Sequence, residues 1–324
     1  GKHCLGGGAG AFSGDLVTFM FVSDGSGAKR DAQNYSLFTQ QEWKLADAFT
    51  LVTGARYDYH SKFKGHPTFR LSGMYKVNKN MTLRGGYSGG FRAPTLKELY
   101  TDWFHPYGGG FQIIGNNNMK AEKSNNFNIS SDLNFKKLNI TLMAQYSKIQ
   151  DKINANWVSS DTVQYVNVGK TDVLSSEVSL SYRLRKSLLL KGAYTYVYEN
   201  PQKRSVTRPH TATVRADYTL DFLKKYAPTI SFSGKYFSSM NTFGTADITD
   251  VDNTTGIDTH TEEYKIYYEP YSIWRLQLSA PLFFNFTASA GINNLFDYKT
   301  KFSSFYSSIS PGRTYYIGLK WDLN

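Results

Sequence analysis

One histidine of this chain lies among aromatic residues, in a stretch that is otherwise rich in glycine and asparagine. His105 is flanked by Phe104, Tyr107 and Phe111. A neutral imidazole is a suitable iron ligand, and the three rings could stack on a flat macrocycle, so these residue types could bind a metal or a macrocycle. A single histidine in a long loop is also an ordinary loop residue, and the residues alone leave both interpretations open.

The remaining polar residues show few other patterns with a defined chemistry. Asp247, Asp250, Asp252 and Asp258 are close enough in sequence to bind calcium, although a solvated acidic loop is the better explanation of them. The sequence contains no paired His-Glu-x-x-His and no phosphate-binding loop. We therefore expect a binding or transport protein that is not an enzyme and requires no cofactor.

The elements that must position these residues alternate between polar and apolar side chains. Between residues 208 and 220, Arg215 and Asp217 fall on one face, and Val214 and Tyr218 fall on the other. Side chains of a strand point alternately to its two faces, and such runs of about ten residues can cross a bilayer at a tilt. An apolar, aromatic outer face and a charged inner face predict an all-β, transmembrane, antiparallel up-and-down β-barrel.

Composition agrees with this fold and excludes others. None of the 324 residues belongs to an apolar run of about 18, the length of a membrane-spanning helix. The 24 Tyr and 22 Phe fit the aromatic girdles of a barrel. The net charge of +11 comes from scattered Lys and Arg residues, which argues against nucleic-acid binding and favours contact with anionic lipopolysaccharide or an anionic ligand.

The pattern divides the chain into a poorly defined N-terminal segment, residues 1–32, and a barrel portion, residues 33–324. Short and long connections alternate in the barrel portion, as expected for periplasmic turns and outer loops. About fourteen strands are predicted, an even number that could close by itself as a passive porin. The predicted strands are 33–44, 48–60, 66–77, 80–91, 122–135, 137–152, 155–169, 172–184, 187–199, 209–221, 227–240, 262–281, 283–296 and 312–323.

Two sequence elements carry a family resemblance. The first is Phe91-Arg92-Ala93-Pro94-Thr95-Leu96-Lys97-Glu98-Leu99-Tyr100, and the second is Gly115-Asn116-Asn117-Asn118-Met119-Lys120-Ala121-Glu122-Lys123-Ser124. Together they resemble a strand, loop and strand segment of TonB-dependent outer-membrane receptors, whose second element reads near Asn-Pro-Asn-Leu-Lys-Pro-Glu. Pro94 lacks an N–H, so the strand must leave the sheet there, and the asparagines favour turns before pairing resumes.

The end of the chain resembles the last hairpin of the same family. Gly318, Trp321 and Leu323 have a spacing similar to the outer-membrane assembly signal. The resemblance covers residues 33–324 and implies the C-terminal part of a probable 22-stranded barrel, with the N-terminal plug domain absent. It also implies that the protein is located in the bacterial outer membrane.

The resemblance further implies a receptor that takes up a scarce iron complex, with energy from the TonB complex acting through the missing plug. Haem is the foremost substrate, since haem receptors of this family resemble the present arrangement and use a histidine between the two elements as an axial iron ligand. His105 is the corresponding candidate. Siderophores and cobalamin are alternative substrates. Outer-membrane lipid, lipopolysaccharide and a surface lipoprotein that captures the ligand are the other expected partners.

Overall fold

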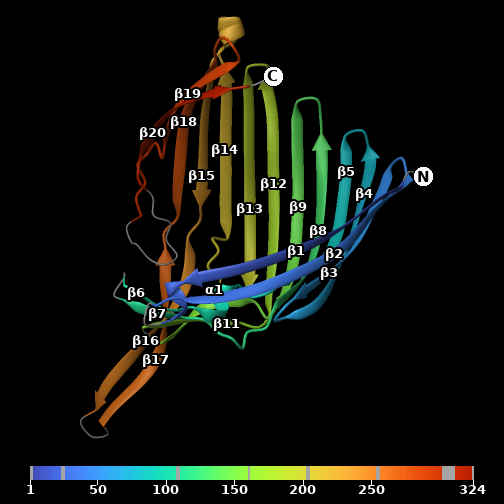
Figure 1. The fold of residues 1–324 in the computed structure, drawn as a ribbon. Coiled ribbons are helices and arrows are strands. Elements are labelled where there is room, and N and C mark those ends of the chain that lie inside the picture. The colour runs from blue at the N-terminus through green and yellow to red at the C-terminus, as the bar shows by residue number, and fades with distance from the viewer. Residues whose placement is uncertain are drawn as a thin grey trace.

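The computed structural model describes residues 3–22, 26–106, 110–159, 161–201, 205–252, 256–300 and 311–322, with backbone alone at 3, 225, 244–252 and 256–261. Most of this chain forms one curved antiparallel sheet (Figure 1). Its fourteen strands, in spatial order, are β1 (His3–Thr18), β2 (Ala28–Ala46), β3 (Phe49–His60), β4 (Lys64–Asn78), β5 (Met81–Arg92), β8 (Glu122–Asn134), β9 (Leu138–Gln150), β12 (Thr171–Arg185), β13 (Leu188–Asn200), β14 (His210–Thr219), β15 (Thr229–Phe237), β18 (Tyr271–Pro281), β19 (Phe286–Asn293) and β20 (Thr314–Trp321).

The strand alternation produces the two predicted faces. On the outer face, Val214 is 49% exposed and Tyr218 is 47% exposed, although both are apolar or aromatic. Arg215 points to the opposite face, and the ladder register places it between Lys191 and Ser233. An exposed apolar outer face is what a lipid-facing wall requires, so the prediction of a membrane-spanning sheet with a polar interior is confirmed.

The main sheet has fourteen strands, as predicted, but one of them was not predicted and one predicted strand lies elsewhere. Segment 1–32, expected to be poorly defined, contains β1, which pairs with β2 along its whole length. Its many glycines weaken the strand signal in sequence, while the ladder to β2 satisfies its backbone groups. Segment 155–169 was predicted as a barrel strand, and this was wrong. The left-handed backbone at Asp151 (φ 54°) turns the chain out of the main sheet after β9.

That segment instead forms two strands of a small sheet at the end of the barrel wall where the long connections lie. The order in this sheet is β10 (Ile153–Ser159), β11 (Thr162–Asn167), β7 (Phe111–Ile114) and β6 (Asp102–His105). Together with α1 (Leu96–Tyr100) it forms a compact layer, here called the cap, opposite the end with the short turns (Figure 1). The cap therefore comes from two connections that lie far apart in the sequence.

Three further segments complete the fold. Predicted strand 262–281 is divided at Pro270, which has no N–H for a ladder, into the end of β17 and all of β18. β17 (Gly256–Tyr268) pairs with β16 (Met240–Asp252) in a two-stranded hairpin. η1 (Phe19–Phe21) and η3 (Asp221–Tyr226) are short 3-10 helices. No helix in the described ranges is long and apolar enough to span a membrane.

Candidate functional site at the loop end of the barrel wall

The first sequence element ends β5 and starts α1. β5 ends at Arg92, two residues before Pro94, as the missing N–H of proline predicts. Thr95 then caps α1: its Oγ1 accepts from the N–H of Glu98 at 3.2 Å, and the Glu98 carboxylate accepts from the N–H of Thr95 at 2.7 Å. This reciprocal capping box satisfies two backbone donors and fixes the Glu98 side chain in one orientation.

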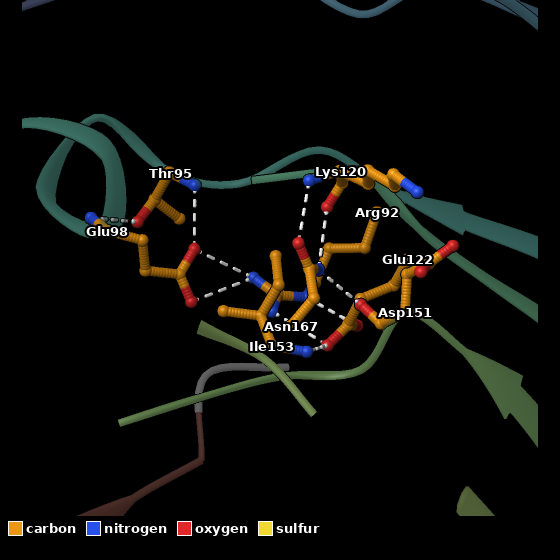
Figure 2. Close-up of polar contacts among 8 residues, drawn as sticks. All are labelled: Arg92, Thr95, Glu98, Lys120, Glu122, Asp151, Ile153 and Asn167. Atoms are coloured by element: carbon orange, nitrogen blue, oxygen red, sulfur yellow. Dashed lines mark hydrogen bonds and ion pairs between the residues drawn. The ribbon is translucent and has the colours of Figure 1, made fainter. Parts of the chain in front are cut away.

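Arg92 joins that side chain to the second element, as Figure 2 shows. Its Nε and Nη2 donate to the two oxygens of Glu122 at 2.7 and 2.9 Å, while Nη1 donates to Glu98 at 2.9 Å. Both carboxylates are largely buried, at 16% and 17% exposure. Glu122 also accepts from the N–H of Ile153 at 2.6 Å. Bidentate charge-assisted bonds of this kind are strong and directional, and we call Arg92, Glu98 and Glu122 the arginine clasp.

A second set of hydrogen bonds, made by a residue of β11, holds the same segment in place. Asn167 Nδ2 donates to the carbonyls of Lys120 at 3.0 Å and Asp151 at 2.6 Å, and Oδ1 accepts from the N–H of Lys120 at 2.7 Å (Figure 2). The amide therefore uses both donor positions and an acceptor. Only a side chain with both functions can bond in this way, so the identity of Asn167 matters as much as its polarity.

The asparagine-rich run packs closely on the end of α1. A Cβ on Gly115 would lie 2.6 Å from backbone atoms of Leu99 and Tyr100, so glycine is required by the close approach. The N–H of Asn116 donates to the Glu98 carbonyl at 2.9 Å, and its Oδ1 accepts from the N–H of Asn118 at 2.9 Å. Through these bonds, one short segment provides hydrogen-bond partners for the C-terminal end of α1 and for the turn itself.

A small apolar core lies beneath the clasp. Leu99, Met119 and Ile153 are 2%, 5% and 7% exposed, and they pack together. Met119 stands where the family pattern has leucine, and it fills the same apolar role in this packing. Tyr165 packs against these residues, where burial first and the Glu98 carboxylate second raise the pKa of its phenol.

The structure thus brings the motif residues Arg92, Pro94, Gly115 and Glu122 together around one helix. Two members of this site were not among the predicted site residues: Glu98, which lies within the first sequence element, and Asn167. Thr95-x-x-Glu98 has the spacing of a capping box, which could have indicated Glu98. Asn167 lies 45 residues beyond Glu122 and has no local signal. The other predicted motif residues are Phe91, which stacks on His66 at 3.9 Å, Ala93, which is half-buried, Asn116 and Asn118.

The aromatic residues around His105 do not all share one surface. His105 ends β6 and stacks on Phe111 with ring centroids 4.8 Å apart, while Trp103 meets it edge to face at 5.0 Å. Phe104 lies between Trp103 and His105 in β6, so its side chain points to the opposite face of the strand, where it is 58% exposed. Tyr107 lies outside the described residues. His105 and Phe111 are therefore together, and Phe104 is apart from them.

The remaining candidate residues lie far from the cap or outside the description. In β20, Gly318 pairs with Ser289, and Trp321 stacks on Phe286 with centroids 5.6 Å apart. Leu323 lies outside the described residues. The side chains of the four candidate calcium ligands, Asp247, Asp250, Asp252 and Asp258, also lie outside the description. The β16–β17 register places Asp250 opposite Asp258. Among the described residues no group of three or more His, Cys, Asp or Glu could hold a metal ion.

A curved antiparallel sheet with an apolar outer face, a polar inner face and a folded cap defines this chain as an outer-membrane β-barrel protein. The family model for the TonB dependent receptor-like β-barrel matches residues 7–295. The chain belongs to the TonB-dependent receptor family. The predicted family, fold and outer-membrane location are therefore confirmed, and no plug domain is present among the described residues.

Two relatives of this chain have names that refer to iron. The chain is 29% identical over 306 residues to the iron-regulated outer membrane virulence protein of Vibrio cholerae, covering 87% of this chain and 43% of that protein. It is 24% identical over 289 residues to the ferrienterobactin receptor of Escherichia coli, covering 82% and 37%. The chain thus spans less than half the length of these relatives.

Solved structures show the same fold. A ferric enterobactin receptor of Pseudomonas aeruginosa superposes with a TM-score of 0.74 at 20% identity, covering 98% of this chain and 50% of that one. The siderophore receptor PirA of Acinetobacter baumannii gives a TM-score of 0.74 at 17% identity, with 98% and 52% covered. At such low identity the likeness establishes the architecture of the wall alone.

Proposed function

We propose that this chain forms wall and outer loops of a receptor that imports an iron complex across the outer membrane. The observation that carries the proposal is the family match over residues 7–295, together with relatives named for iron regulation and for ferric enterobactin. In this proposal the cap, held by the arginine clasp, covers the outer end of the wall.

A ferric siderophore is the substrate class that the relatives' names favour. Haem is the second candidate, because His105 lies in the stretch between the two motif elements and is only half-buried. A haem site here would need a partner other than Phe104, whose ring lies on the opposite face of β6. His105 remains the axial ligand in this second proposal.

The proposed transport needs energy and contacts beyond this sequence. We propose the TonB complex as the energy source, acting through a plug domain, and lipopolysaccharide or a surface lipoprotein as outer contacts. The chain is proposed to bind and transport without catalysis. Gly86-Tyr87-Ser88-Gly89-Gly90 has the spacing of a hydrolase nucleophile elbow, but it lies inside β5 rather than at a strand-to-helix turn.

Uptake by cells that carry the full-length receptor tests the function. Iron-starved cells lacking other receptors should accumulate radioactive iron from a ferric siderophore, and a proton uncoupler should abolish the uptake. Uptake that continues in the presence of the uncoupler would support a passive porin instead. For the haem alternative, haem is titrated into the purified full-length receptor and its His105→Ala variant. An unchanged Soret shift and affinity in the variant would remove His105 from the site.

A further inference from the structure

The turn between β3 and β4 supports the cap on one side. Its Phe63 packs against the small apolar core of the cap. Lys62 Nζ donates to Asn117 Oδ1 at 3.3 Å and lies 5.2 Å from the centre of the Tyr100 ring. The turn therefore contacts residues of both sequence elements, and its conformation affects how firmly the cap is held.

This turn is closed by the side chain of His60, the last residue of β3. His60 Nδ1 accepts from the N–H of Lys62 at 3.1 Å and from the N–H of Phe63 at 3.4 Å. A ring nitrogen accepts only through a lone pair, so both bonds require Nδ1 to carry no proton. The closed turn therefore depends on a neutral imidazole.

A second histidine contacts the same turn as a donor. His66 Nε2 lies 2.8 Å from the carbonyl oxygen of Phe63, which can only accept, so Nε2 carries the proton. His66 also stacks on Phe91 with ring centroids 3.9 Å apart. An imidazolium keeps this N–H, and a cation is tolerated over an aromatic face. Protonation therefore removes the acceptor at His60 and leaves the bond of His66 intact.

The surroundings of His60 oppose a positive charge on its ring. The residue is only 9% exposed. β2 places the uncharged Asn34 opposite it in the ladder. The charged and titratable side chains of the turn and of the adjoining ends of β3 and β4 are Lys62, Lys64, His66 and Asp58, the last paired with Arg56 at 2.7 Å. With its one carboxylate already paired, this group offers little compensation for a further cation.

His60 lies beyond the lipid-facing part of β3, because the outward and exposed Tyr57 and Tyr59 mark the membrane interface. There burial, and then the charges of His66 and Lys62, lower the pKa of its imidazole. A histidine with a lowered pKa in the closed turn takes up its proton more readily when the turn is open. Closure is therefore fully favoured above the ordinary pKa of about 6.5 and is weakened as the pH falls below it.

We propose that His60 is a pH-sensitive switch that holds the β3–β4 turn on the cap when it is neutral and releases the turn when it is protonated. The new proton on Nδ1 points at two backbone N–H groups and adds a charge beside Lys62. The turn then opens, Phe63 leaves the apolar core, and the cap loses its support on this side. The switch acts on the cap itself and is independent of which substrate the receptor imports.

Hydrogen exchange of the purified full-length receptor in detergent tests the switch. Exchange is measured at about pH 8 and about pH 5, the range in which histidine changes its charge. Protection is corrected for the pH dependence of chemical exchange, and β9 in the wall serves as the internal reference. We expect protection of the Lys62 and Phe63 amides, and of the α1 amides, to fall several-fold at the lower pH while β9 is unchanged.

The matched variants are His60→Asn and His66→Gln. Asparagine Oδ1 offers an acceptor in place of Nδ1 and takes up no proton, so the protection of the turn in His60→Asn should not depend on pH. Glutamine Nε2 retains the donor of His66, so His66→Gln should show the pH dependence of the wild type.

Three results would overturn the proposal. The first is equal protection of the wild-type turn at both pH values, a measurement that needs no variant. The second is the same pH dependence in His60→Asn as in the wild type, since another group would then be the sensor. The third is loss of the pH dependence in His66→Gln, which would assign the switch to His66.

Discussion

The barrel wall and the cap are stabilised in different ways. The wall is a continuous ladder in which each strand bonds to its neighbour over many residues, and its large apolar side chains face outward. The cap depends on one arginine, two carboxylates, one asparagine and a core of three buried residues. The wall therefore tolerates changes that respect the face of the sheet, whereas the cap depends on the identity of a few residues.

The largest expected effect is on the wall. Leu180→Arg places a charge on the outer face near mid-strand and should cost about 2–4 kcal/mol of unfolding free energy in lipid. Ser179→Arg, one residue away on the inner face, should cost much less because the lumen is polar. Equilibrium unfolding of the full-length receptor in liposomes measures both. Similar costs at the two positions would show that the two faces are assigned incorrectly.

A smaller effect, confined to the cap, is expected from breaking the arginine clasp. Arg92→Ala leaves the Glu98 and Glu122 carboxylates without their shared partner and should destabilise the cap by about 1.5–3 kcal/mol. Limited proteolysis of the folded receptor should show faster cleavage between residues 92 and 122. Arg92→Lys is the matched variant, since it keeps the charge and loses the planar fork. A cleavage rate equal to that of the wild type in Arg92→Ala would contradict a stabilising role for the clasp.

The smallest effect is expected at the start of α1. Thr95→Ala removes the cap acceptor for the Glu98 N–H and should cost about 1 kcal/mol of local stability. Hydrogen exchange of the α1 amides measures the change, and Thr95→Ser, which retains the hydroxyl, serves as the control. If the alanine and serine variants exchange alike, the side-chain cap does not hold the helix.

The same contrast explains what the sequence could predict. The wall follows a period of two, so strand faces, the number of strands and the exit at Pro94 could be predicted from local patterns. The cap depends on contacts between distant segments. The alternation of segment 155–169 fits a strand of the main sheet and a strand of the cap alike, and only its partners in the cap decide where it lies. Asn167 meets Lys120 across 47 residues, which no local pattern encodes.

The positions around His105 show a further limit of the same kind. His105 and Phe111 stack on each other, but the alternation of β6 separates Phe104 from them. Residues that are neighbours in sequence share one surface only where successive side chains do not alternate between the two faces of a strand. The short strands of the loop were not predicted, so this separation was not anticipated.

The two outermost strands of the main sheet have a consequence for biogenesis. β1 and β20 each have one row of backbone N–H and C=O groups without a ladder partner among the described residues. In hydrocarbon each such group costs several kcal/mol, so strands cannot enter the bilayer one at a time with their edges open. Insertion must be coupled to closure of the sheet. Before closure, the same edges are templates for aggregation and must be shielded in the aqueous phase.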